Sequence, residues 1–326
     1  MKEFILKSLL FAICITIVIL AINVFLPLGW GKIRLAHKTE YFLEHRNEYN
    51  TIVVGSSLVH NHIKPTVFDE LTTENTSTFN LGLGSMYFFE SYYFLENLLK
   101  KDIDINNVIF LIQFPRPIAD INMGTIETNY FLDFKRYQLA RNYFTDVNDL
   151  NKLWKSFLYN KLQIGSLFER ISFPFRLKNY YLENDDLSLN LGYDNLMNSN
   201  TEYKRNQDRV RQLDEWWEKL EINLQSQITT NRTTFLRKVI NVDLYMEYIA
   251  EINKMCNEHK VRCTFLLMPN YDFQEEFKNY SYIYMGNSKS FPEFYSSEFR
   301  ADRGHLNDKG AELFSRRLAK SYNEQN

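Results

Sequence analysis

Two short apolar runs constrain the fold of this chain more than any other feature of its sequence. Thr51–Gly55 and Asn107–Gln113 each hold a central stretch of consecutive apolar residues, without the regular polar positions of a half-solvated strand. Strands that are buried on both faces of a parallel sheet have this continuous pattern. The runs therefore predict a parallel sheet with helices covering both of its faces.

The segments around these runs alternate between helix and strand patterns. Pro65 suits the first turn of a helix, where its missing N–H is not needed, and Met86–Leu99 has an amphipathic, aromatic-rich helix pattern. The alternation resumes at Asn241, a residue type favoured as a helix N-cap. Alternating strands and helices predict a three-layer α/β/α sandwich with right-handed crossovers. The other predicted elements are helix Thr66–Leu71, strand Thr76–Leu81, helix Val242–His259, strand Val261–Met268 and a final helix over about Asp308–Tyr322.

The N-terminal residues 1–31 have the pattern of a transmembrane helix. No charged residue occurs between Lys7 and Lys32, and the apolar run is long enough for the roughly 20 residues that cross a bilayer core. A cleaved signal peptide has a shorter apolar region and a small-residue cleavage site, which is not evident here, so we favour an uncleaved signal anchor. Basic residues are almost equally frequent on both sides of the run, so charge alone does not orient it.

Residues 118–240 interrupt the alternation of strands and helices. They contain helical patterns such as Asp149–Asn160 and Tyr203–Gln225, polar loops, and no clear pattern of a parallel strand. We interpret them as a helical insertion in an α/β domain of residues 51–326, serving as a lid or a partner-binding cap, and a separate domain is the alternative. Residues 32–50 are polar and mixed in charge, which indicates a juxtamembrane connector or a short helix.

The charge balance and the cysteines limit the classes of function. With 40 acidic and 38 basic residues the formal net charge is −2, so nothing indicates nucleic acid as a partner. The three cysteines lack the CxxC spacing of a zinc site. Cys256 and Cys263 could form a disulfide in an extracytoplasmic domain, but we favour two buried free thiols. His60 and His62 form a His-x-His pair without an evident third ligand, so we predict no metal site and no cofactor.

Two separated motifs could form a nucleophilic site. Ser57 follows the predicted strand Thr51–Gly55, and Asp302 stands three residues before His305 near the C-terminus. A serine hydroxyl needs a base within hydrogen-bond reach and an acid that fixes the tautomer of that base. We therefore predict Ser57 as the nucleophile, His305 as the base and Asp302 as the residue that orients it. The alternative is a set of capping and surface residues with no catalytic role.

A nucleophilic attack on a carbonyl also needs N–H donors for the developing oxyanion. The backbone amides of Ser57 and Gly82 are candidates because both residues follow predicted strands, whose carboxyl ends share one edge of a parallel sheet. Glycine also lets the backbone approach a ligand closely. Gln113, at the end of the third strand, could donate from its side chain. The predicted oxyanion donors are therefore Ser57, Gly82 and Gln113.

The order of these motifs resembles that of the SGNH, or GDSL, hydrolase superfamily. Gly55-Ser56-Ser57-Leu58 resembles its first block, with serine where aspartate is usual. Asn80-Leu81-Gly82 resembles its second block and Asp302-Arg303-Gly304-His305 its fifth. The third block usually carries Gly-x-Asn-Asp, whereas the third strand of this chain ends in Gln113. The fifth block is the most specific part of the resemblance.

The resemblance covers about residues 50–118 and 241–322 and implies a fold, an activity and a location. It implies a serine esterase or O-acyltransferase that acts on an acylated cell-envelope glycan through an acyl-enzyme. The anchored layout is similar to SGNH-like proteins of teichoic-acid D-alanylation and alginate O-acetylation, whose domain lies outside the cytoplasmic membrane. The same placement is implied here, with a membrane acyl-donor protein as partner. The missing Gly-x-Asn block favours the alternative, a catalytically inactive binding or scaffold subunit of a polysaccharide-modification complex.

Overall fold

A computed structural model describes the N-terminal helix and most of an α/β domain. The chain divides into two units, residues 1–37 with 116–185 and residues 38–115 with 186–326. The described residues are 1–25, 33–84, 86, 88–101, 103–112, 137–138, 141, 151, 154, 191–194, 242–268, 274–285, 290–302 and 304–325.

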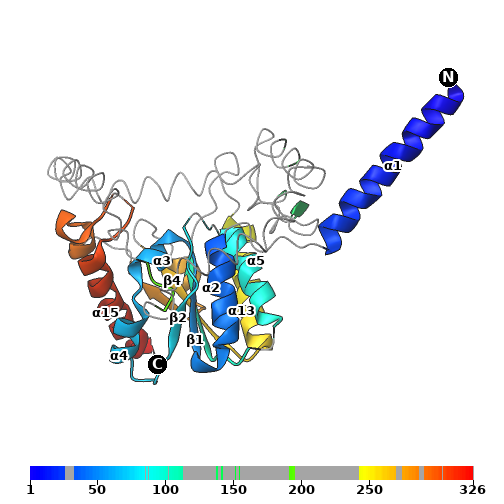
Figure 1. Ribbon diagram of the computed structural model, residues 1–326. Helices are drawn as coiled ribbons and strands as arrows, with labels where there is room; N and C mark the ends of the chain where they lie inside the picture. The colour runs from blue at the N-terminus through cyan, green and yellow to red at the C-terminus, as the bar shows by residue number, and fades with distance from the viewer. Residues whose placement is uncertain are drawn as a thin grey trace. The chain divides into compact units, whose positions relative to one another are not determined.

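Helix α1 (Lys2–Phe25) is a long apolar helix at the N-terminus (Figure 1). Its Lys2–Ala21 part is long and apolar enough to cross a membrane, and none of it is buried. Among the described residues, no other helix meets this criterion. Large side chains such as Phe4 and Phe11 are therefore exposed along the helix. The helix is compatible with the predicted signal anchor and also with a signal sequence.

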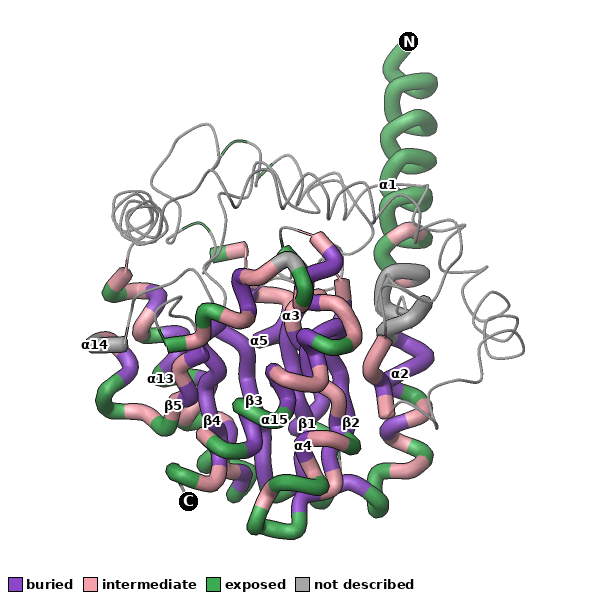
Figure 2. The backbone as a smooth tube through the Cα atoms, turned by 90° about the vertical axis from the view of Figure 1, so that its left-hand side faces the viewer, coloured by how far each residue is buried: buried purple, intermediate pink, exposed green. Residues whose placement is uncertain are grey.

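One parallel sheet forms the centre of the second unit, with strand order β2-β1-β3-β4-β5. Each pairing between neighbouring strands is parallel. Every residue of β1, β2 and β3 is buried, and Figure 2 shows these strands in purple. The predicted parallel sheet with covered faces is therefore confirmed. The strands are β1 (Thr51–Val54), β2 (Thr78–Asn80), β3 (Asn107–Ile112), β4 (Arg262–Leu267) and β5 (Tyr282–Tyr284).

Helices cover both faces of this sheet, as Figure 1 shows. Helix α15 packs against α3 and α4 on one face, and α5 packs against α13 on the other. The structure thus confirms the predicted three-layer α/β/α sandwich. The helices are α2 (Ile33–Glu44), α3 (Ser57–His62), α4 (Pro65–Leu71), α5 (Phe88–Leu99), α13 (Val242–Glu258), α14 (Gln274–Phe277) and α15 (Asp308–Gln325), with short 3-10 segments at Arg46–Glu48, Pro292–Tyr295 and Ser297–Phe299.

Helix α2 belongs to the α/β unit from Lys38 onward. Phe42 is fully buried, and its ring centroid lies 5.7 Å from that of Phe79 in β2. Tyr41 stacks on the same ring at 5.8 Å. The segment 32–50, which we interpreted as a connector or short helix, therefore supplies a helix whose apolar face covers the β2 side of the sheet.

The structure differs from the prediction at two short elements. Strand β5 lies between the predicted strand Val261–Met268 and the final helix, and α3 directly follows β1; neither element was predicted. With three and six residues, these elements are too short to show a periodic pattern in the sequence. The predicted insertion, residues 118–240, lies outside the described residues apart from a few positions.

The two cysteines of the α/β unit are buried free thiols. Cys256 lies near the end of α13 and Cys263 near the start of β4. The hydrogen bond to Cys256, and then burial, raise the pKa of the Cys263 thiol well above its usual range. The Cys263 thiol therefore stays protonated at neutral pH. The free state of both cysteines agrees with the thiols that we favoured over a disulfide.

Candidate active site

Helix α3 presents Ser57 at the carboxyl end of β1. The strand ends at Val54, and Ser57 is the first residue of the helix. Ser56 is the N-cap, and its side-chain oxygen accepts a hydrogen bond from the Leu58 N–H at 3.2 Å. An N-cap serine satisfies a donor of the first helical turn. The two adjacent serines thus differ in role, because Ser56 caps the helix whereas the Ser57 hydroxyl lies beside His305.

Ser57, His305 and Asp302 form one chain of hydrogen bonds. Ser57 Oγ lies 2.8 Å from His305 Nε2, and His305 Nδ1 lies 3.0 Å from each carboxylate oxygen of Asp302. A carboxylate only accepts hydrogen bonds, so the proton of the neutral imidazole is on Nδ1 and Nε2 accepts from the serine hydroxyl. This is the tautomer in which a histidine can take a proton from a serine. The structure therefore brings together the three residues predicted as a triad.

The neighbours of Asp302 keep its carboxylate ionised. Burial acts to raise its pKa, but the hydrogen bond and charge of His305, with the backbone N–H groups of Gly304 and His305, lower the pKa to about 2. These two amides donate to Asp302 Oδ1 at 2.7 and 2.9 Å. The carboxylate is therefore negative at neutral pH and orients the imidazole without taking its proton.

His62 holds the loop that carries His305. The backbone N–H of Leu306 donates to His62 Nε2 at 2.9 Å. The two imidazole rings meet edge to face with centroids 6.0 Å apart. Burial, followed by the charges of His305 and Arg300, lowers the pKa of His62 well below its usual value, against an opposing effect of Asp302. His62 is therefore neutral, and its Nε2 is available as an acceptor for the loop.

Replacing His62 by glutamine should make the stability of the protein less dependent on pH. The pKa of His62 is lower in the folded than in the unfolded protein, so the unfolded chain binds more protons below its usual pKa of about 6.5. Acidification from pH 7 to pH 5 should therefore lower the free energy of unfolding by up to about 2 kcal/mol through this group. Glutamine can still accept from Leu306 and does not titrate. Thermal unfolding at both pH values measures the difference, and equal pH dependence of the two proteins would contradict it.

The structure shows different environments for the three predicted oxyanion donors. The Ser57 N–H begins α3, and within the described part of the chain no hydrogen bond uses it. The Gly82 N–H donates to Asn80 Oδ1 at 2.9 Å, so its hydrogen is engaged inside the turn. Gln113 lies outside the described residues. An oxyanion role for Gly82 thus requires Asn80 to share or release this amide, and all three assignments stay predictions.

Asn80 joins the second motif to the helix of the nucleophile. Its side-chain amide donates to the carbonyl oxygens of Val59 and Ile63 at 2.9 and 2.8 Å. Its side-chain oxygen accepts from Gly82, and the residue is fully buried. All hydrogen-bonding groups of this side chain are therefore used to hold the turn after β2 against α3.

Ser57 lies beside the point where the strand order reverses. Strand β1 pairs with β2 on one side and with β3 on the other. In open parallel sheets of this order, ligands bind beyond the carboxyl ends of the strands at this crossing. The topology therefore places the candidate nucleophile where α/β proteins commonly bind a ligand.

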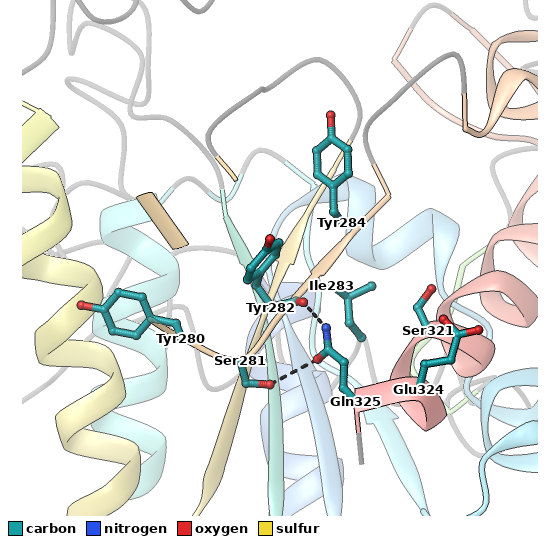
Figure 3. Close-up of a pocket in the computed structure, with 8 residues that line it drawn as sticks. All are labelled: Tyr280, Ser281, Tyr282, Ile283, Tyr284, Ser321, Glu324 and Gln325. Atoms are coloured by element: carbon teal, nitrogen blue, oxygen red, sulfur yellow. Dashed lines mark hydrogen bonds between the residues drawn. The ribbon is translucent and has the colours of Figure 1, made fainter. Parts of the chain in front are cut away.

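The pocket in Figure 3 is a separate surface feature at the outer edge of β5. Its volume is about 510 Å³, and it is lined by residues 280–284 with Ser321, Glu324 and Gln325 of α15. Gln325 accepts from Ser281 Oγ at 3.3 Å and donates to a backbone oxygen of β5. No residue of the Ser57 site lines this pocket, so we assign it no part in the chemistry.

Two polar residues near the site were not among the predicted functional residues. His62 entered only as half of a His-x-His pair, and Lys38 was not singled out. The histidine pair has separate partners, because His62 accepts from Leu306 whereas His60 lies between Lys38 and Asp194. These contacts join residues distant in the sequence, and no local pattern signals them.

Comparisons with known proteins assign no family to the chain. No protein-family model matches it, and no curated protein sequence matches it. The structure defines an α/β domain with a five-strand parallel sheet of order 2-1-3-4-5 and a hydrogen-bonded serine, histidine and aspartate. The resemblance to SGNH hydrolases therefore rests on the sequence motifs.

Proposed function

We propose that this protein is a membrane-anchored serine esterase or O-acyltransferase of the SGNH type. The observation that carries the proposal is the continuous hydrogen-bond chain from Ser57 Oγ through His305 to Asp302, with each contact at 3.0 Å or less. The start of α3 supplies the nucleophile, and the loop before α15 supplies the base. A base and an orienting acid in these positions activate a serine that is otherwise a weak nucleophile.

The reaction follows from the proton positions in this chain. Ser57 Oγ attacks the ester carbonyl while His305 Nε2 takes its proton, and His305 then gives this proton to the leaving alcohol. The acyl group is now bound to Ser57. In the second step water or a sugar hydroxyl attacks the acyl-enzyme while His305 Nε2 takes a proton from it, and His305 then donates this proton to Ser57 Oγ as the acyl group leaves. Asp302 stays ionised throughout, since its pKa is about 2, and stabilises the imidazolium.

An acyl ester of a cell-envelope glycan is the substrate that we propose. The exposed apolar helix α1 suits a signal anchor, and the resemblance to anchored SGNH-like proteins favours the extracytoplasmic side of the membrane. A single helix does not move an acyl group across a bilayer, so a membrane acyl-donor protein is the partner we expect. A reporter fused to the C-terminus tests the orientation, and activity confined to the cytoplasm would contradict it.

A second candidate function is that of an inactive binding or scaffold subunit. The hydrogen bond between the Gly82 N–H and Asn80 favours it, because a donor that is engaged elsewhere weakens an oxyanion hole. Removing one oxyanion donor typically lowers kcat by about 10²–10³-fold. The ordered Ser57–His305 contact opposes this candidate, because a scaffold has no physical need for it.

Covalent labelling of the full chain in detergent tests the proposed activity. We expect a fluorophosphonate probe to modify the folded protein once, at Ser57, as located by mass spectrometry. Ser57→Ala should not react. Ser56→Ala is the matched control, because it loses the N-cap, at about 1 kcal/mol of stability, but keeps the nucleophile.

The same variants distinguish the two candidate functions. Labelling of the wild type and of Ser56→Ala, but not of Ser57→Ala, would support the esterase or acyltransferase. A folded wild type that does not react, together with normal envelope acylation in a Ser57→Ala strain, would support the scaffold subunit instead.

A further inference from the structure

A row of three ionisable side chains joins helix α2, helix α3 and the segment 191–194. Lys38 Nζ lies 2.8 Å from His60 Nδ1, and His60 Nε2 lies 3.3 Å from Asp194 Oδ2. Lys38 is 1% and His60 4% exposed, whereas a third of the Asp194 side chain is exposed. The row therefore runs from the interior of the α/β unit toward its surface.

With Lys38 in its ammonium form and Asp194 in its carboxylate form, the tautomer of His60 between them is fixed. An ammonium group only donates and a carboxylate only accepts. His60 Nδ1 thus accepts from Lys38, and the proton of the neutral ring is on Nε2, where it donates to Asp194. A cation and an anion are joined through a neutral ring, so the group as a whole carries no net charge. Buried charges are tolerated in such paired and hydrogen-bonded arrangements.

Lys38 also holds the turn that follows β2. Its Nζ donates to the carbonyl oxygen of Gly82 at 2.8 Å and to that of Asn80 at 3.2 Å. A Cβ atom at Gly82 would lie 2.5 Å from His60 N, so the turn packs directly on α3 and needs glycine there. One cation therefore binds both the turn and the helix whose first residue is Ser57.

Residues 191–194, a segment within residues 118–240, contact both the turn after β2 and helix α3. The Leu191 carbonyl accepts from the Asn80 N–H at 2.9 Å, and the Asp194 N–H donates to the His60 carbonyl at 3.2 Å. Gly192 has a φ of 82°, which favours glycine, and a Cβ there would meet the Asn80 carbonyl oxygen. Backbone and side chain of this segment therefore both contact the turn and α3.

We propose that Lys38 and Asp194 are positioning residues for Ser57. Lys38 sets the turn Asn80–Gly82 against α3, and Asp194 completes the arrangement by fixing the ring of His60. This inference rests on the proposed function, because it concerns the placement of its nucleophile. Neither residue touches the reacting atoms. Helix α2 contributes Lys38 and the insertion contributes Asp194, the two ends of this row of three side chains. Both parts of the protein therefore act on the site through α3.

Substitutions of Lys38 and of Asp194 should lower turnover without changing substrate binding. For the full chain in detergent, we expect Lys38→Met to lower kcat for p-nitrophenyl acetate by about 10²-fold with little change in KM, since displacement of a reacting group by about 1 Å has an effect of this size. Asp194→Ala, at the more exposed end, should lose about tenfold in kcat. Asp194→Asn keeps an acceptor for His60 Nε2–H and should recover most of this loss.

The Asp194 variants keep the test decisive if Lys38→Met does not fold. Glu74→Gln is the matched control, because it breaks the ion pair with Arg262 at the start of β4, the opposite end of the strands from Ser57. It should leave kcat unchanged within twofold, whatever its effect on stability.

Each outcome of these measurements is informative. The expected result is a loss of kcat in Asp194→Ala, its recovery in Asp194→Asn and an unchanged Glu74→Gln. A wild type that neither reacts with fluorophosphonate nor turns over would overturn the proposed function and this inference with it. An active wild type with unchanged kcat in Asp194→Ala, or with an equal loss in Glu74→Gln, would overturn this inference alone.

Discussion

Replacement of His305 by alanine is expected to lower kcat for ester hydrolysis by about 10⁴-fold or more while the protein stays folded. The imidazole lies 2.8 Å from Ser57 Oγ and is the base that we propose for both steps of the reaction. Members of such a catalytic unit lose activity on this scale when they are removed singly. His259→Ala is the matched control, because this exposed histidine follows α13. A His305→Ala protein within tenfold of the wild type would contradict the proposed triad.

Asp302→Asn should give a loss of similar size, about 10⁴-fold, for a different reason. Asparagine can still accept from the backbone N–H groups of Gly304 and His305, so the loop should keep its shape. Its amide group would face His305 Nδ1 and favour the tautomer with the proton on Nε2, which does not accept from Ser57. The wild-type carboxylate has a pKa of about 2 and stays charged from pH 4 upward. The amide of the variant does not ionise in this range, so raising the pH to 9 should not restore its activity. Restoration would contradict the assigned role.

Replacement of Asn80 by alanine is expected to lower the free energy of unfolding by about 3 kcal/mol or more. The variant leaves the Ile63 carbonyl and the Gly82 amide without this partner at a fully buried position, whereas the Val59 carbonyl keeps its bond from the Ile63 N–H. Each buried polar group without a partner typically contributes about 1–3 kcal/mol of destabilisation. Denaturant unfolding followed by circular dichroism measures the effect.

Asn97→Ala is the control for Asn80→Ala. Asn97 in α5 also donates through its side-chain amide to a backbone carbonyl, that of Tyr93, at 2.8 Å. It is only partly buried, so water can replace the lost bond and the change should stay within about 0.5 kcal/mol. Equal effects of the two substitutions would show that Asn80 is not the joint between β2 and α3.

The central fold could be predicted because its signals are local. Strands β1 and β3 are buried on both faces, and this burial requires the continuous apolar runs that the sequence shows. The helices α5, α13 and α15 are long enough for their apolar faces to repeat. Strand β2 lies within the predicted strand Thr76–Leu81, whereas the three-residue strand β5 was not predicted, because its place depends on pairing with β4 and not on a pattern of its own.

The candidate site was predictable only in part. Ser57 and the Asp302–His305 pair stand out because each is a compact motif, and the structure places them in contact. The contributions of Lys38 and His62 arise from contacts between distant segments, which no spacing in the sequence reveals. The turn at Gly82 shows the same limit, since its amide is used by Asn80 and not left free.

Helix α3 carries Ser57 at one end and His62 at the other, and this arrangement has an evolutionary consequence. The six residues of the helix form a rigid span of about 9 Å. This one short helix therefore sets the distance between the nucleophile and the residue that holds the loop of the base. The aromatic segment between β4 and the His305 loop does not set this distance alone, because the Leu306 N–H of the loop binds directly to His62 Nε2. Substitutions at the exposed positions of that segment can therefore accumulate across related chains without moving the base, whereas its buried residues, such as Ile283 and Phe294, are held by the core.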